Sequence, residues 1–418
     1  MTALRHHRAL LVLLGGGLAL RLALAFVLFP GQGYASDIGL FWRWATSLAA
    51  SGPGGFYTST PTANYPPGYL YVLWVIGLIG NPGLLKVPAM LADIGIAALV
   101  YALARRWRDT RTGLVAAALL LFLPVAWYDS ALWGQVDAVG TMVALAALLL
   151  LVDGWSEAAL ATALLAVLVK PQYAIVLGVV LPVLVRRHLV RRGSGPRPRL
   201  GVRMGRLDAL LGGILEDQGP RRLASSAVLA GLVAILVLLP FDIGRHAPAS
   251  LAGIPVIGNV AGLLGLFGYL GSEFSVLTAN AFNGWALAGS PSLASVLGGA
   301  TGNWQPDSLV VAGGLSAATV GAVLLVAVGA LVAGGLLVRE GIVPILLAFT
   351  ILALAFFVLP TRVHERYLFP FFATASVLAA GSLAGTAGLV VVALLDTVNL
   401  HAVLAGNVFL GSTACRLT

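Results

Sequence analysis

The sequence predicts an all-α, polytopic membrane protein with about eleven transmembrane helices, and its composition is the first reason. Of the 418 residues, 59% are hydrophobic and 10% are charged, and the mean hydropathy is +0.96. Soluble domains have about a quarter of their residues charged, so this composition excludes an ordinary soluble enzyme. The single cysteine, Cys415, excludes an internal disulfide framework and a cysteine-built metal site.

A series of apolar stretches is the second reason, because a helix needs roughly 20 apolar residues to cross a bilayer. The first stretch is too long for a signal peptide and is interrupted by Arg21, so we expect it to remain as an uncleaved span. The expected spans lie at about 9–29, 84–104, 113–129, 138–153, 157–170, 172–186, 223–241, 309–335, 341–360, 367–386 and 387–408.

The distribution of basic residues is the third reason, and it predicts the orientation. Ten of the 25 Lys and Arg residues lie in the stretch 186–222, which is typical of a cytoplasmic loop. A cytoplasmic N-terminus places 17 of the 25 inside and seven outside, with Arg21 within the first span. We therefore expect a multi-pass protein of the cell membrane. No aromatic residues interleave the basic stretch, so nucleic-acid binding is not expected.

Two long segments are expected on the outer side, within a single transmembrane domain formed by residues 1–418. The first, about 30–83, contains two apolar pieces, 38–50 and 67–80. The second piece is too short to span and would reverse the charge distribution if it did, so we expect both pieces to be interfacial helices. The other outer segment, about 242–308, also contains apolar pieces.

Asp37 is the candidate catalytic residue of the first outer segment. It follows the first span and precedes the aromatic segment Phe41-Trp42-Arg43-Trp44. A carboxylate at the membrane boundary can take a proton from an acceptor hydroxyl, whereas the alternative interpretation is a helix cap.

Three further short motifs place polar residues beside aromatic ones on the outer side. In Trp133-Gly134-Gln135-Val136-Asp137, the amide and carboxylate could bind a sugar and the indole could stack on it, or the indole could be an interfacial anchor. Lys170 and Gln172 form an outer hairpin, where the lysine would pair with a protein carboxylate or a ligand phosphate. The prolines after Tyr65 form a rigid turn that starts the second interfacial helix.

Arg362-Val363-His364-Glu365-Arg366-Tyr367 is the strongest local signal. It places two guanidiniums, an imidazole and a carboxylate between apolar spans, which suits phosphate binding or, alternatively, a salt-bridged anchor. The spacing differs from the HExxH zinc motif, so neither a metal site nor a cofactor is expected.

Together with the loop Asn283-Gly284-Trp285, the order of these motifs over about 30–402 resembles the GT-C superfamily of membrane glycosyltransferases, which use polyprenyl-phosphate sugars. The resemblance implies that the first outer loop carries a catalytic acidic residue, which here is Asp37. It also implies that His364, Glu365 and Arg366 line the donor-phosphate region. Arg362, Lys170 and Gln172 would lie near the phosphate, whereas the substrate-binding residues would be Tyr65, Trp133, Gln135, Asp137, Asn283 and Trp285.

The expected function is therefore transfer of mannose or glucose from a polyprenyl-phosphate donor to a lipid or glycan hydroxyl, with inversion. Two alternatives remain. A transporter or lipid-linked-sugar flippase would use the polar residues within spans, which are Asp93, Asp396, Asn399 and His401. In that case Asp396 and His401 would form a proton relay. The other alternative is a structural assembly subunit with an inactive site.

Overall fold

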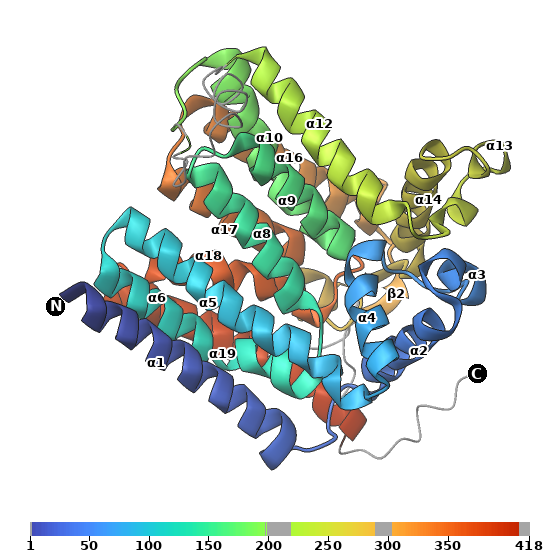
Figure 1. Ribbon diagram of the computed structural model, residues 1–418, viewed down its shortest axis with the longest axis horizontal. Coiled ribbons are helices and arrows are strands. Elements are labelled where there is room, and N and C mark those ends of the chain that lie inside the picture. Colours follow the sequence, from blue (N-terminus) through green and yellow to red (C-terminus); the bar gives the residue numbers. More distant parts are fainter. Residues whose placement is uncertain (1, 197, 199–218, 289–302, 409–418) are drawn as a thin grey trace, which may run out of the picture.

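The computed structural model describes residues 2–196, 198, 219–288 and 303–408, and these form a helical bundle (Figure 1). Six helical stretches of this part of the chain are long and apolar enough to cross a membrane. The pair Thr110–Phe122 and Pro124–Trp133, bent by 52°, makes a seventh if it is counted as one span. The polytopic helical architecture is thus confirmed, while the count of eleven spans stays a prediction. Cys415 and most of the basic stretch 186–222 lie outside the described residues.

The N-terminal half alternates long helices with short turns of 3-10 or π-helix. Its α-helices are α1 (Thr2–Leu22), α2 (Ala35–Ser51), α3 (Phe56–Ser59), α4 (Pro67–Ile79), α5 (Val87–Trp107), α6 (Thr110–Phe122), α7 (Pro124–Trp127), α8 (Asp137–Val152), α9 (Ser156–Val169) and α10 (Leu177–Val185). The short turns are η1 (Ala23–Leu28), η2 (Pro53–Gly55), η3 (Pro82–Lys86), η4 (Tyr128–Trp133), η5 (Pro171–Val176) and η6 (Arg186–Val190).

The C-terminal half adds further helices and four short strands. The α-helices are α12 (Pro220–Leu238), α13 (Ala249–Ala252), α14 (Ile257–Glu273), α16 (Ala317–Val338), α17 (Ile342–Val358), α18 (Phe369–Ala379) and α19 (Leu383–Val408). The short turns are η7 (Ile243–His246), η8 (Gly284–Ala286) and η9 (Glu365–Leu368). The strands are β1 (Val276–Thr278), β2 (Asn303–Pro306), β3 (Val310–Ala312) and β4 (Leu315–Ser316), paired antiparallel as β1 with β2 and β3 with β4.

The β3–β4 hairpin corrects the expected span 309–335, which begins only at Ala317. Gly313 and Gly314 join the two strands with φ values of 55° and 79°, a left-handed conformation that glycine adopts without strain. A Gly-Gly pair between apolar residues is a known two-residue hairpin signal, but the apolar content of the flanking residues concealed it.

The two short helices expected in the first outer segment are present as α2 and α4, and they pack against each other. The contact is close at Gly77, where an added Cβ would lie 1.9 Å from the carbonyl oxygen of Ala45. α4 begins at Pro67, as the proline turn predicts, and ends at Ile79, where Gly80 follows with φ of 76°. Figure 1 shows α2, α3, α4 and α14 gathered at one end of the bundle.

The ion pairs outside this end of the molecule are structural. Arg21, which interrupts the first span, is fully buried and pairs with Asp93 in α5 at 2.6 Å. Arg106, near the end of α5, pairs with Asp153 after α8 at 2.8 Å, and Arg187 in η6 pairs with Glu340 after α16 at 2.5 Å. A charge inside a span is retained when it is paired, so Asp93 is explained without a functional role.

Candidate active site

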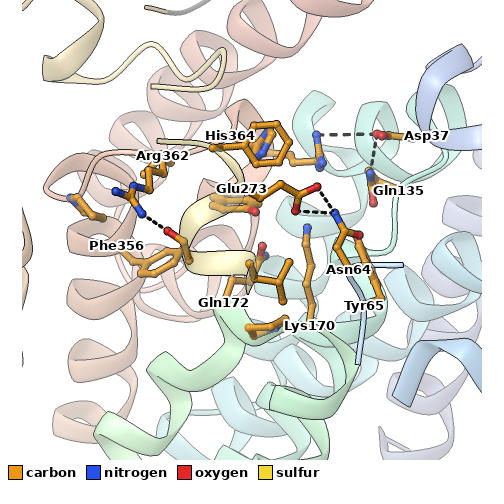
Figure 2. A pocket seen from close by; sticks show the side chains of 18 of the residues that line it. Asp37, Asn64, Tyr65, Gln135, Lys170, Gln172, Glu273, Phe356, Arg362 and His364 are labelled. Carbon is orange, nitrogen blue, oxygen red and sulfur yellow. Dashed lines mark hydrogen bonds and ion pairs between the residues drawn. The ribbon is translucent and has the colours of Figure 1, made fainter. Parts of the chain in front are cut away.

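A pocket of about 520 Å³ opens at the end of the bundle that carries α2 and α14. Its walls come from the first outer segment, the α9–η5 hairpin, α14 and the loop between α17 and η9. Figure 2 shows the side chains that converge there from these distant parts of the chain, among them Asp37, Asn64, Tyr65, Gln135, Lys170, Gln172, Glu273, Arg362 and His364. The expected convergence of Asp37 with the 362–367 segment is therefore observed.

Asp37 is held by one carboxylate oxygen and presents the other. Its Oδ2 accepts hydrogen bonds from Trp133 Nε1 at 2.8 Å and Gln135 Nε2 at 2.6 Å. Oδ1 has no hydrogen-bond partner among the described residues, and Asp37 lines the pocket. The alternative interpretation as a helix cap is wrong, because α2 begins at Ala35 and has no side-chain cap. A carboxylate fixed on one side and open on the other has the geometry of a general base.

Arg366 is the central cation of the site. Three carboxylates lie within 4 Å of its guanidinium: Nη1 is 2.5 Å from Glu365 Oε1 and 3.9 Å from Asp37 Oδ2, and Nε is 3.4 Å from Asp137 Oδ2. Although burial opposes it, these carboxylates raise the pKa of Arg366, so it is always charged. Nη2 makes no hydrogen bond to a described residue, and Arg366 lines the pocket, so this nitrogen is available to a ligand anion.

Asp137 connects Arg366 to the α9–η5 hairpin. Its Oδ1 accepts from Lys170 Nζ and from Gln172 Nε2, both at 2.8 Å. Lys170 therefore pairs with a protein carboxylate, which was one of the two partners expected from its position on the outer side. Its ammonium keeps two further N–H donors beside the pocket. Asp137 itself is fully buried and lies beneath the lining rather than in it.

The ionisation of the 364–365 pair is controlled by burial. Burial lowers the pKa of His364 well below its usual range, and the charges of Arg366 and Lys170 lower it further. The imidazole is therefore neutral at physiological pH and can donate one hydrogen bond. Burial also raises the pKa of Glu365, while Arg366 lowers it. Glu365 is 1% exposed and does not line the pocket, so it positions Arg366 instead of touching a ligand.

The positive charge of the site is more neutralised than the sequence suggested. Arg362 Nε is 2.5 Å from Asp307 Oδ2, and its Nη1 donates to the carbonyl of Gly271, although the side chain lines the pocket. Lys170 is paired as described above. Arg362 and Arg366 each keep an Nη2 without a hydrogen bond to a described residue, and Arg366 is the one of the two that lies beside Asp37.

Four of the expected substrate-binding side chains lie outside the pocket lining: Asp137, as described above, and Trp133, Asn283 and Trp285. Trp133 is fully buried and offers no stacking face; instead its indole orients Asp37. Asn283 and Trp285 donate from their side chains to the carbonyls of Phe357 and Leu359, so they fasten η8 to the end of α17. Indoles and amides have the same sequence signature in a sugar site and in such a support, so spacing alone could not separate the two roles.

α14 supplies a wall of the pocket for which the sequence indicated no substrate contact, although Glu273 is one of the acidic residues expected on the outer side. Glu273, at its end, accepts two hydrogen bonds from Asn64 Nδ2, at 3.0 and 2.8 Å, which joins the two outer segments across the pocket. The apolar side chains Phe267, Leu270 and Phe274 line the same wall. The available signal was a carboxylate at the end of an apolar stretch, which is a functional pointer near a membrane.

The proton relay expected of a transporter is not formed. His401 Nδ1 is 2.8 Å from the hydroxyl of Tyr128, and Asn399 binds the backbone at Asn280 and Phe282. Asp396 has no hydrogen-bond partner among the described residues. His401 and Asp396 therefore do not form a chain.

Comparison with known proteins agrees with the resemblance expected from the motifs. Residues 64–194 match the model of the dolichyl-phosphate-mannose-protein mannosyltransferase family. This stretch resembles the GT-C membrane glycosyltransferases. It contains Tyr65, Gln135, Asp137 and Lys170, whereas Asp37 and Arg366 lie outside it. No curated protein matches the chain.

Two solved structures similar to the whole chain are oligosaccharyltransferases of Archaeoglobus fulgidus. The archaeal oligosaccharyltransferase AglB, in complex with an inhibitory peptide and a dolichol-phosphate, is 16% identical and has a TM-score of 0.47 over 95% of this chain and 55% of that chain. The apo form is 16% identical and has a TM-score of 0.49 over 95% and 56%. This chain thus spans about half the length of those proteins.

Proposed function

We propose that the protein is a membrane glycosyltransferase that transfers a hexose from a polyprenyl-phosphate sugar to an acceptor hydroxyl. The observation that carries the proposal is the pairing of an open carboxylate with an open guanidinium. Asp37 Oδ1 and Arg366 Nη2 both lack partners among the described residues, and their side chains lie 3.9 Å apart in one pocket. A base beside an anion-binding cation is what sugar transfer from a phosphate requires.

The pocket has one part suited to each end of the donor. Arg366 Nη2, the remaining donors of Lys170 and the neutral His364 would bind the phosphate. Phe267, Leu270, Phe274 and Phe356 form an apolar part of the lining that suits a polyprenyl chain. Glu273 and Asn64, which also line the pocket, are placed to accept and donate hydrogen bonds to sugar hydroxyls.

The reaction would be a single displacement. Asp37 Oδ1 takes the proton of the acceptor hydroxyl while the oxygen of that hydroxyl attacks the anomeric carbon. The bond from that carbon to the phosphate oxygen breaks, and the phosphate leaves with the electron pair, stabilised by Arg366 and Lys170. One displacement inverts the anomeric configuration.

We infer the orientation of the site from charge. The pocket lies at the end of the bundle opposite to Arg106 and Arg187, whose neighbourhood is rich in arginine. The positive-inside rule places that arginine-rich end in the cytoplasm, so the pocket would open on the outer side of the cell membrane.

The test is to incubate the purified protein with polyprenyl-phosphate mannose or glucose and extracted membrane lipids. A new glycosylated product, with release of polyprenyl phosphate, is the expected result. Accumulation of the sugar lipid in the other leaflet of sealed vesicles, without any transfer, would instead establish a flippase.

Lys170 should impose a pH dependence on donor binding. Burial lowers its pKa, although Asp137 opposes the shift, so its ammonium is lost at lower pH than that of an exposed lysine. We expect the KM for the donor to rise about tenfold as the pH rises from neutral through this lowered pKa. Lys170→Arg keeps its charge, so the rise should disappear in that variant. Steady-state kinetics at several pH values will check this, and an identical alkaline rise in both proteins would contradict it.

A further inference from the structure

A second cavity of about 360 Å³ adjoins the proposed active site. It is lined by Leu40, Arg43, Trp44, Ser47, Ser59, Thr60, Pro61 and Thr62. Leu40 also lines the first pocket, so this side chain separates the two cavities. None of the residues that carry the proposed transfer chemistry lines the second cavity.

Arg43 gives this cavity a positive charge. It is the one charged residue of the lining, its side chain is exposed, and it forms no ion pair with a described residue. This differs from the first pocket, where the cations have carboxylate partners. An arginine without a counter-ion, facing a cavity, is suited to bind a phosphate or carboxylate through its planar fork.

Hydroxyl groups line the same cavity as this guanidinium. Ser47 Oγ lies 2.9 Å from Ser59 Oγ and 2.9 Å from Thr60 Oγ1, which ties α2 to the segment after α3. Thr62 adds a fourth hydroxyl to the lining. Hydroxyls both donate and accept, so they suit the polar substituents of a sugar.

The spacing along α2 relates this cavity to the proposed chemistry. Asp37 and Arg43 are six residues apart on one helix, which corresponds to a rise of about 9 Å and a rotation of about 120°, and Leu40, midway between them, lines both cavities. An acceptor with its hydroxyl at Asp37 could therefore extend past Leu40 and place a charged group at Arg43.

We propose that the second cavity binds an anionic group, a phosphate or a carboxylate, carried by the glycan or lipid acceptor. The assignment to the acceptor rests on the proposed glycosyltransferase function, whereas the existence of an anion site does not. The cavity makes the enzyme selective for charged acceptors over neutral ones of the same length.

The test measures the binding of mannose 6-phosphate to the full chain in phosphatidylcholine nanodiscs, by calorimetry, with mannose as the neutral comparison. We expect mannose 6-phosphate to bind more tightly than mannose and Arg43→Gln to weaken its binding about tenfold or more. The affinity of Arg43→Lys for mannose 6-phosphate should lie between those of the wild type and Arg43→Gln. The control is Arg111→Gln, which removes an exposed arginine near the junction of α5 and α6, far from the cavity. This variant should bind mannose 6-phosphate as the wild type does.

Two outcomes would overturn the proposal. If Lys170→Gln rather than Arg43→Gln removes the binding, the probe occupies the first pocket. If phosphatidylglycerol in the nanodiscs abolishes the Arg43-dependent binding, the site belongs to a lipid headgroup and not to the acceptor. Because neither measurement requires turnover, the result can be interpreted even if the protein transfers no sugar. Conversely, a failed transfer assay with Arg43-dependent binding intact would refute only the proposed function.

Discussion

Replacing Asp37 by Asn is expected to reduce sugar transfer by about 10²- to 10⁴-fold, the range that a general base contributes. The amide oxygen can still accept the hydrogen bonds of Trp133 and Gln135, so the fold around the site should persist. The group presented to the pocket can no longer accept a proton from the acceptor hydroxyl. Initial rates with saturating donor and acceptor will measure the loss.

The control for this variant is donor binding. The change removes a negative charge beside Arg366, so the affinity for the donor phosphate should be unchanged or higher. A loss of donor affinity would show that the Asp37 carboxylate organises the pocket instead of taking a proton. Turnover close to that of the wild type would remove Asp37 from the base role.

Replacing Arg366 by Gln should cost both stability and donor binding. The substitution leaves Asp37, Asp137 and Glu365 close together without the cation that they share. Removing one partner of a buried ion pair costs about 3–5 kcal/mol of the free energy of unfolding. The open Nη2 is lost at the same time, so we expect the donor affinity to fall by about tenfold or more.

Arg366→Lys separates these two effects. Lysine restores the positive charge among the carboxylates, so most of the thermal stability should return. It cannot restore the planar fork, so donor binding should stay weak. Thermal unfolding and donor binding in the same nanodiscs measure the two quantities, and Arg105→Gln, an exposed arginine at the far end of α5, controls for loss of charge alone. Donor affinity equal to that of the wild type in Arg366→Gln would contradict the phosphate role.

The charged residues of the pocket could be predicted from the sequence because a charge at a membrane boundary is costly and is therefore rare without a function or a partner. Asp37, Lys170 and Arg366 stand out for that reason, and they meet in one pocket. Their pairing was not predictable, because the contact of Asp137 with both Lys170 and Arg366 depends on how α8, α9 and η9 pack.

Other features were missed because local signals were ambiguous. Trp133 is an oriented support rather than a stacking platform, since both roles place an indole next to an amide and a carboxylate. α14 appeared only as an apolar piece of a long segment, so nothing local indicated that Glu273 reaches Asn64. The residues 289–302, which belong to the same expected outer segment, lie outside the described part of the chain.

The lengths of α8 and α9 have a consequence for how a lipid-borne substrate reaches the pocket. They contain 16 and 14 residues, so they rise about 24 and about 21 Å, less than the roughly 30 Å of a bilayer's hydrocarbon interior. α16, with 22 residues, rises about 33 Å. Asp137 begins α8 and Lys170 follows α9, so both residues stand at the ends of helices that are shorter than the hydrocarbon interior. A carrier with a long isoprenoid tail could therefore present its headgroup sideways, with its tail still dissolved among the acyl chains.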